Sequence, residues 1–488
     1  MNEELLVLKP SGIWKYFREI LEIPRPSKHE EKIVAYLLAF AAKHKLDIER
    51  DKVGNVLIRK PAYRGFEDRK TVILQSHIDM VCEKNSDKTH DFHNDPIDTF
   101  IEDGWVKAKG TTLGADDGIG VAAQLAILSD NSIQHGPIEC LFTVDEETGL
   151  TGAFGLEPGF LKGNILLNLD SEDEGELFIG CAGGKDTVIH IPFEKTKVPE
   201  SHLTYKVSVT GLKGGHSGDD IHKGLGNANK ILNRLLWRAD RDFDIRLSHI
   251  EGGNLRNAIA REAYAIILVP ETHQLNFDIA LSVLGSQIKN EYNITEPQLS
   301  IQMMAMSEKP GFVVELDDQK KLLNSLYACP HGVIAYSQSI QGFVETSTNL
   351  ASVRMHDEQW EITTSQRSSV ESAKDDIAFM VASCFYLAGA AVKHGNGYPG
   401  WAPNPNSAIR ELTEKSYLIL FHEQPQVKAI HAGLECGLIG DKYPGMDMIS
   451  YGPTIKGAHS PDERLNIETV TRFWELTLEI LRNIPAKN

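Results

Sequence analysis

Four short apolar runs within the first 170 residues constrain the fold more than any other feature of this chain. They predict buried strands at 55–58, 71–74, 141–144 and 165–167. Helices are predicted at 27–42, where Ser27 and Glu30 have the spacing of a capping box, and at 120–129. Strands that alternate with helices form crossover units and a largely parallel sheet. Ligands bind such sheets at the carboxyl ends of the strands.

The middle of the chain has a different pattern. Apolar and polar residues alternate at 203–209, 263–268 and 298–303, and a helix is predicted at 225–238. This pattern is typical of an antiparallel sheet with helices on one face. The segment HGNGYPGWAPNPNS, rich in Gly, Pro and Asn, marks a linker back to the first region. We therefore expect an α/β fold with a mostly parallel mixed sheet flanked by helices, in a discontinuous domain (1–186 and 399–488) interrupted by an α+β domain (187–398).

The charge balance limits the classes of partner. The chain has 68 Asp and Glu residues against 50 Lys and Arg residues, a formal net charge of −18. Nucleic-acid binding needs clustered basic residues, so we expect no nucleic-acid partner. No apolar run reaches the ~18 residues of a membrane span, and the first residues lack the basic start of a signal peptide. Six cysteines without a CxxC spacing fit free thiols. We expect a cytoplasmic protein with no membrane partner.

Acidic and histidine residues gather beside the predicted core strands. QSHID, DEETG and NLDSED each overlap or follow the end of a predicted strand, GADDG precedes the helix at 120–129, and GAHSPDE lies near the C-terminus. Alone, each has an ordinary explanation, such as a solvated turn, a strand-end histidine or a helix cap, which is the role expected for Asp117. Together they can converge at one sheet edge, where the candidate metal ligands are His77, Asp116, Glu147, Asp170 and His459.

Nitrogen and oxygen donors without a thiolate suit a pair of divalent ions, Zn²⁺ first and Co²⁺ or Mn²⁺ as alternatives. One carboxylate would bridge the ions, and each ion would keep one histidine and one further carboxylate. Two ions ~3.5–4 Å apart around a shared water are a standard hydrolase arrangement. Asp79 is placed to orient the imidazole of His77. Of the adjacent Glu146 and Glu147, one can bind a cation while the other acts as general base.

The ordered set SHIDMV, LGADDGIG, DEETG, NLDSED and GAHSPDE resembles the co-catalytic dizinc metallopeptidases that include carnosinase, carboxypeptidase G and the bacterial tripeptidase. Within that family the sequence is most similar to the Xaa-His dipeptidases, and the similarity extends over nearly the whole chain. The resemblance implies a zinc-peptidase-like catalytic domain with an inserted lid and dimerisation domain. It also implies that Asp116 bridges the ions and that Glu146 is the general base. One departure is that Gly118 and Ile119 stand where relatives usually have Lys and Gly.

The same resemblance implies substrate-binding residues in the inserted domain. His216, in GGHSG, would hold the carbonyl of the scissile bond, in its own site or in that of a neighbouring subunit. Asn257 and Arg367 would bind polar groups of the substrate, and the arginine could clamp a terminal carboxylate with two hydrogen bonds. Gly433, in GLECG, would offer its backbone N–H to the same carboxylate.

The implied activity is hydrolysis of unblocked dipeptides, especially Xaa-His dipeptides such as carnosine, by a cytoplasmic homodimer with two metal ions per chain. Three alternatives stay open at this point. The first is a sister activity of the same family, such as an aminopeptidase, a tripeptidase or an amidohydrolase. The second is a metal-dependent phosphoesterase, which the charge of −18 disfavours. The third is a non-catalytic protein that binds small peptides.

Overall fold

The computed structural model describes residues 2–487, which form two compact units. The first unit runs up to Gly180, continues over Pro403–Ala429 and resumes at Leu434. The second unit contains Cys181–Ala402 and the short segment Ile430–Gly433. The chain therefore leaves the first unit after Gly180 to build most of the second, returns at Pro403, and crosses to the second unit once more over Ile430–Gly433.

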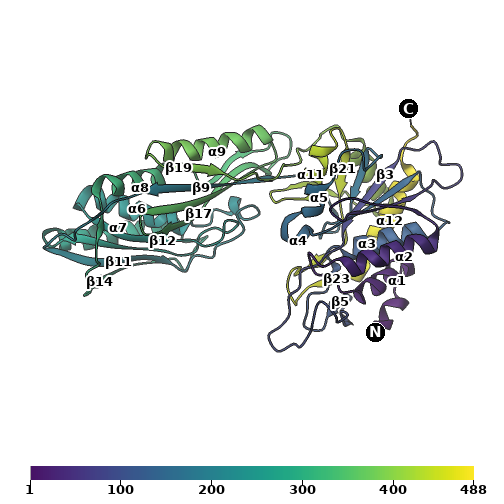
Figure 1. Ribbon diagram of the computed structural model, residues 1–488, viewed down its shortest axis with the longest axis horizontal. Helices are drawn as coiled ribbons and strands as arrows, with labels where there is room; N and C mark the ends of the chain where they lie inside the picture. Colours follow the sequence, from purple (N-terminus) through teal and green to yellow (C-terminus); the bar gives the residue numbers. More distant parts are fainter. Residues whose placement is uncertain (1, 488) are drawn as a thin grey trace. The chain divides into compact units, whose positions relative to one another are not determined.

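An eight-stranded mixed sheet forms the centre of the first unit (Figure 1). In spatial order its strands are β1 (Asp47–Arg50), β2 (Val56–Lys60), β6 (Ile138–Thr143), β3 (Val72–His77), β7 (Ile165–Asn168), β21 (Asp447–Ser450), β8 (Glu176–Cys181) and β20 (Gln426–Ile430). The inner strands β6, β3, β7 and β21 run parallel, whereas β1, β2 and β8 pair antiparallel with their neighbours. The predicted α/β class with a mixed sheet is confirmed.

The inner strands are apolar because they are covered on both faces. Every residue of β3, β6 and β7 is buried. Such strands appear in a sequence as continuous apolar runs rather than as alternating patterns. All four of the predicted strand runs overlap strands of this sheet.

Helices cover the sheet and complete the first unit. Helix α1 packs on α3, α3 contacts β3, and α10 contacts both α12 and β21. The helices are η1 (Glu3–Val7), α1 (Ser11–Leu21), α2 (Glu31–His44), α3 (Ala115–Ser129), α4 (Glu146–Gly149), α5 (Thr151–Gly155), α10 (Ala408–Phe421), α11 (Glu435–Lys442) and α12 (Ile467–Asn483). A separate four-stranded sheet contains β22 (Ile455–Lys456), β23 (Arg464–Asn466), β5 (Trp105–Ala108) and β4 (Thr99–Glu102).

The capping box predicted at Ser27 is wrong, although the helix it was meant to start is present. Helix α2 begins at Glu31, and its N-cap residue Glu30 makes no side-chain capping bond. The buried Glu30 carboxylate instead accepts hydrogen bonds from the backbone N–H groups of Lys28 and Asp145. Asp145 lies on a distant segment of the chain. The Glu30 side chain therefore makes a tertiary hydrogen bond in place of the helix-capping bond that the local pattern predicted.

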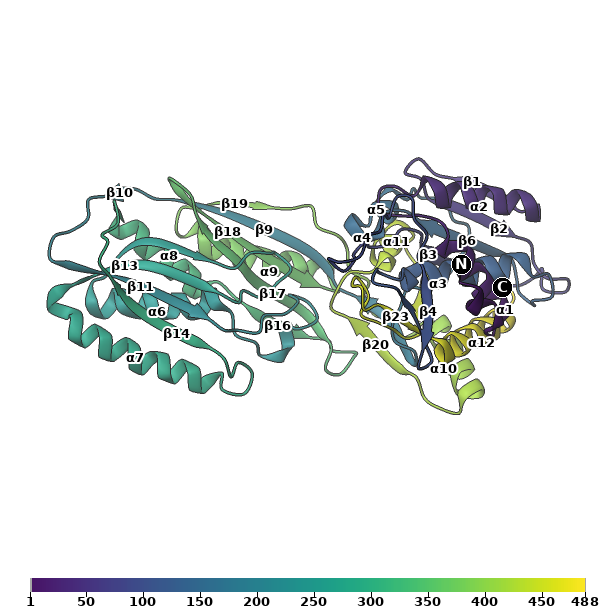
Figure 2. The ribbon, with the colours of Figure 1, turned by 90° about the horizontal axis from the view of Figure 1, so that it is seen from below.

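A second sheet dominates the second unit (Figure 2). Its strands in spatial order are β14 (Ser300–Met306), β11 (His202–Thr210), β13 (Ala263–Pro270), β12 (Arg246–Gly252), β17 (Val344–Met355), β18 (Gln359–Ser368), β9 (Gly183–Pro192) and β19 (Ala391–His394), with β16 (Gly332–Tyr336) paired to β17. Its pairings are antiparallel. Strands β10 (Lys195–Thr196) and β15 (Val313–Val314) form a separate pair.

The helices of the second unit pack against this sheet as a connected layer. Helix α6 contacts α7 and α8, and α8 contacts α9. The alternation seen in the sequence marks the covered face, since Tyr205, Val207 and Val209 of β11 all lie in the apolar core. The helices are η2 (Ile221–Lys223), α6 (Ala228–Phe243), η3 (Glu271–His273), α7 (Gln274–Glu291), α8 (Leu316–Ala328) and α9 (Glu371–Tyr386). In neither unit does a helix within residues 2–487 combine the length and the apolar character that a membrane span needs.

Candidate metal centre

The carboxyl ends of three parallel strands meet at one edge of the first unit's sheet. His77 is the last residue of β3, and in the strand register it lies opposite Thr143, the last residue of β6. Strand β7 ends at Asn168 on the other side of β3. Because the strands are parallel, the acidic segments that follow them all leave the sheet at this edge.

Two histidines face the two oxygens of one aspartate. The Nε2 atom of His77 lies 3.0 Å from Oδ1 of Asp116, and Nε2 of His459 lies 3.1 Å from its Oδ2. Asp170 lies 3.4 Å from Nε2 of His77, and Glu147 lies 3.0 Å from Nε2 of His459. These contacts define two groups that share Asp116, one with His77 and Asp170 and one with Glu147 and His459. Within each group the ligand atoms lie within 4.8 Å of one another.

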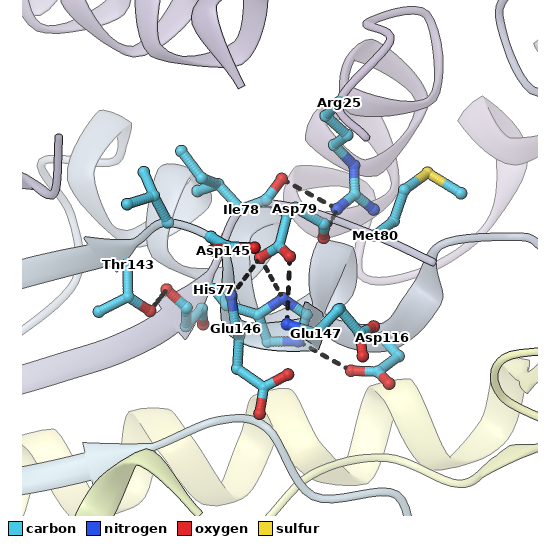
Figure 3. A network of polar contacts seen from close by, with 12 residues as sticks. Arg25, His77, Ile78, Asp79, Met80, Asp116, Thr143, Asp145, Glu146 and Glu147 are labelled. Atoms are coloured by element: carbon cyan, nitrogen blue, oxygen red, sulfur yellow. Dashed lines mark hydrogen bonds and ion pairs between the residues drawn. The ribbon is translucent and has the colours of Figure 1, made fainter. Parts of the chain in front are cut away.

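Asp79 lies behind this cluster and contacts both of its halves (Figure 3). Its Oδ1 lies 3.2 Å from Nδ1 of His77, on the ring edge opposite Asp116. Its two oxygens also accept hydrogen bonds from the backbone N–H groups of Glu146 and Glu147, at 3.0 and 3.2 Å. The fully buried carboxylate therefore orients the imidazole and holds the first turn of α4 beside it.

Two residues that the sequence did not single out hold the loop that carries Asp116. The buried carboxylate of Glu463 accepts hydrogen bonds from the backbone N–H groups of Leu113, Gly114 and Ala115, at 2.7 to 3.0 Å. The buried guanidinium of Arg25 donates to the carbonyl oxygens of Ile78, Asp79 and Gly114. Arg25 thus links the loop after β3 to the loop before α3.

Asp117 has the structural role expected for it. Its buried carboxylate accepts a hydrogen bond of 3.1 Å from the N–H group of Gly120, within the first turn of α3. The backbone of Asp116 and Asp117 is not helical, so the regular turns of α3 start after Asp117, and this bond caps them as predicted.

The acidic surroundings strongly favour protonated histidines. Hydrogen bonds from its ring to the carboxylates of Asp116 and Glu147 raise the pKa of His459 to about 11. Burial alone would lower the pKa of His77, but Asp170, Asp116 and Asp79 outweigh it and raise the pKa well above its usual value. Burial, reinforced by Asp116, raises the pKa of Asp170 to about 7. Two neutral imidazoles cannot balance the negative charge of these carboxylates. The cluster therefore needs bound protons or cations.

The carboxyl group of Glu146 also favours its protonated form. Burial raises the pKa of its side chain, and the charges of Asp170 and Glu435 add to the effect while His77 opposes it. Glu435, which the sequence did not single out, is fully buried and accepts hydrogen bonds from Gln75 and Thr143 at 2.6 and 2.8 Å.

The donor set fits divalent metal ions. Within residues 2–487, the ion pairs of Asp116, Glu147 and Asp170 are made only with His77 and His459. The buried Oε1 atom of Glu147 has no hydrogen-bond partner among the described residues. Clustered carboxylates with an unpartnered oxygen need positive charge, and nitrogen and oxygen donors match ions of the zinc, cobalt and manganese type.

The predicted substrate-binding residues all lie in the second unit. Nδ1 of His216 accepts weak hydrogen bonds from the N–H groups of Gly218 and Asp219, at 3.3 and 3.2 Å. Nη2 of Arg367, on β18, lies 3.4 Å from Nε2 of His216. The carbonyl oxygen of Asn257 accepts a 2.8 Å hydrogen bond from Ser217, so the exposed Asn257 adjoins the His216 loop.

Gly433 lies against an aromatic ring. A Cβ atom built on Gly433 would lie 2.8 Å from Cε2 of Tyr398, so only a residue without a side chain fits there. The Tyr398 hydroxyl in turn accepts a 3.0 Å hydrogen bond from Nη1 of Arg367. Tyr398 therefore joins the predicted group, although no motif in the sequence marked it.

Known proteins share this sequence and fold. The model of peptidase family M20/M25/M40 matches residues 73–483. The chain is 46% identical over 488 residues to the cytosol non-specific dipeptidase of Escherichia coli (strain K12), a match covering 99% of this chain and 100% of the relative. It matches the crystal structure of aminoacylhistidine dipeptidase from Vibrio alginolyticus with a TM-score of 0.95 and 43% identity, covering 100% of this chain and 99% of that one.

A more distant structure shows likeness of fold alone. Aminopeptidase PepT from Bacillus cereus ATCC 10987 matches with a TM-score of 0.58 and 16% identity, covering 98% of this chain and 99% of that one. The family model spans far more than half of the chain, and the Escherichia coli relative spans nearly all of it. The chain therefore belongs to peptidase family M20/M25/M40, and it is a peptide hydrolase.

Proposed function

We propose that this protein is a dipeptidase that hydrolyses unblocked dipeptides, Xaa-His dipeptides such as carnosine among them, with two divalent metal ions. The observation that carries the proposal is the sharing of Asp116 by two groups of potential ligands. The names of the two most similar relatives described above, a cytosol non-specific dipeptidase and an aminoacylhistidine dipeptidase, support the substrate class.

Each group would hold one ion. His77 and Asp170 would bind the first, Glu147 and His459 the second, and Asp116 would bridge them, with Asp79 orienting His77. Bound divalent ions, Zn²⁺ foremost and Co²⁺ or Mn²⁺ as alternatives, would polarise the peptide carbonyl and lower the pKa of water.

Glu146 would move the proton. Its carboxylate would accept a proton from the attacking water and later deliver it to the amine that leaves. Burial raises the pKa of Glu146, so its carboxylate takes up a proton more readily than an exposed glutamate does, as this role requires. The backbone bond from Glu146 to Asp79 keeps α4 in place.

The second unit would recognise the substrate. His216 would donate a ring N–H group to the carbonyl oxygen of the substrate as charge develops there. Arg367 would bind the terminal carboxylate, with Asn257 and the backbone of Gly433 as further polar contacts. The catalytic domain predicted at 1–186 and 399–488 would correspond to the first unit. The domain predicted at 187–398 for substrate binding and dimerisation would correspond to the second unit, which also contains Ile430–Gly433.

A cytoplasmic homodimer is part of the proposal. The word "cytosol" in the name of the Escherichia coli relative supports the compartment. Helix α7 supports the dimer, because its apolar residues Leu275, Ile279 and Val283 are spaced four apart and are 71%, 55% and 53% exposed. Such a stripe beside the edge strand β14 is typical of an interaction surface.

The deciding experiment is a hydrolysis assay with metal analysis of the same preparation. We expect turnover of a free Xaa-His dipeptide and little turnover of its N-acetyl form, of a tripeptide or of a phosphodiester. Preferred cleavage of the tripeptide, of the acetylated substrate or of the phosphodiester would favour the respective alternative activities. Full turnover by protein stripped of metal would reject the mechanism.

A further inference from the structure

The guanidinium of Arg367 is not held in a direct ion pair, although the charge of Asp219 is near enough to interact with it. Arg367 is 7% exposed, yet it forms no ion pair with any carboxylate of residues 2–487. Its buried Nε atom also has no hydrogen-bond partner among the described residues. A buried cation without a directly hydrogen-bonded carboxylate is costly, and a bound anion offsets that cost. This side chain is therefore suited to receive a carboxylate.

Tyr398 shares this location and is tightly held. Its backbone N–H and C=O both bond to Gly184, and its carbonyl oxygen also accepts a 2.6 Å hydrogen bond from Lys374. Cβ atoms built on Gly184 and Gly433 would lie 2.7 and 2.8 Å from opposite edges of the Tyr398 ring. Two glycines thus leave just enough room for the ring, so the position of the hydroxyl is preorganised.

The hydroxyl of Tyr398 has a proton to give. It accepts from Nη1 of Arg367, and within residues 2–487 no acceptor lies within hydrogen-bond distance of its own O–H group. Burial raises the pKa of Tyr398, although Arg367 opposes the effect, so the hydroxyl stays protonated near neutral pH. An O–H donor and a guanidinium directed at the same region form a site for a planar anion with two oxygens.

We propose that Tyr398 is a second donor to the terminal carboxylate of the substrate, beside Arg367. This inference rests on the proposed dipeptidase function and adds a specificity-determining residue to it. A carboxylate accepts from both donors. A C-terminal amide places an N–H₂ group against one of them, leaving a buried polar group unpaired. Tyr398 would therefore help the protein to select peptides whose free C-terminal carboxylate lies one residue after the scissile bond, as it does in a dipeptide.

The test compares wild type and Tyr398→Phe on a free Xaa-His dipeptide and on its C-terminal amide. Phe keeps the ring between the two glycines and removes only the hydroxyl. We expect KM for the free dipeptide to rise about tenfold or more, with kcat within about twofold and no change for the amide. Gly184→Ala, whose Cβ would lie 2.7 Å from the ring and displace it, should produce the same selective rise.

Tyr264→Phe is the matched control, because it removes a hydroxyl of the same unit that bonds Glu251 at 3.2 Å. It should leave both KM values unchanged. An active wild type whose Tyr398→Phe variant keeps its KM, or loses affinity equally for dipeptide and amide, overturns this inference alone. A wild type inactive on both substrates overturns the proposed function, and this inference with it.

Discussion

The imidazole of His459 lies 3.1 Å from the carboxylate of Asp116, although 343 positions separate the two residues along the chain. The other oxygen of the same carboxylate faces His77. A side chain placed between two histidines in this way can serve two cations at once. The following predictions test this arrangement and its consequences.

Removing the shared carboxylate of Asp116 should weaken the binding of both ions. Removing the carboxylate of Asp170, which belongs to a single group of ligands, should weaken the binding of mainly one ion. We expect Asp116→Asn to retain almost no metal after dialysis and Asp170→Asn to retain about one of about two ions per chain. Elemental analysis by mass spectrometry measures this content. Asp173→Asn is the control, since Asp173 pairs with Lys456 at the surface. Equal metal content in the Asp116 and Asp170 variants would contradict the shared role.

Glu146→Gln should separate chemistry from metal binding. The amide keeps the shape of the side chain but cannot take up the proton, so kcat should fall by about 10²- to 10⁴-fold. Metal content should equal that of wild type, because Glu146 belongs to neither of the groups that share Asp116. Glu157→Gln, which changes an exposed partner of Lys52, is the control. A Glu146→Gln enzyme with wild-type kcat would remove Glu146 from the mechanism.

Metal affinity should increase with pH. The pKa of His459 is raised to about 11, so metal-free protein holds a proton there at neutral pH, and an incoming ion must displace it. The apparent affinity should therefore rise up to about tenfold per pH unit for each proton displaced between about pH 6 and pH 8. Calorimetric titration in buffers of different ionisation enthalpy counts the protons. An affinity independent of pH would show that the histidines are neutral beforehand.

The carboxylate of Glu463 should matter for both stability and metal binding. It accepts three backbone hydrogen bonds of 3.0 Å or less, so Glu463→Gln should lower the free energy of unfolding by about 1–3 kcal/mol. Metal affinity should fall about tenfold or more, because the loop that positions Asp116 loosens. Chemical denaturation and metal titration measure the two effects. Glu468→Gln, at an exposed position five residues later, should change neither.

The stripe on α7 should mediate the proposed dimer. Val283→Glu places a charge at one end of this apolar stripe, and we expect light scattering to show a shift from dimer to monomer. Lys289→Glu changes the charge elsewhere on the same helix and should leave the dimer intact. A wild type that is monomeric at every accessible concentration would reject the dimer, and a dimeric Val283→Glu variant would place the interface elsewhere.

Local sequence patterns predicted the central strands of the first unit, the gathering of acidic residues at their ends and one helix cap. Continuous apolar runs predicted β3, β6 and β7, because strands covered on both faces must be apolar throughout. Residues at the ends of those runs, His77, Glu147 and Asp170, predicted a cluster at one sheet edge, because the ends of parallel strands coincide. The capping function of Asp117 was also readable, because a helix cap involves residues only a few positions apart.

Tertiary structure alone decided what holds these residues in place. Glu463 reaches the Asp116 loop across about 350 positions, Arg25 joins two separate loops, and Tyr398 fits between Gly184 and Gly433. Glu30 likewise bonds the N–H group of Asp145 instead of capping its own helix. Such contacts depend on which distant segments the fold brings together. A hydrogen bond between remote residues leaves no periodicity or spacing in the chain, so only the folded structure reveals it.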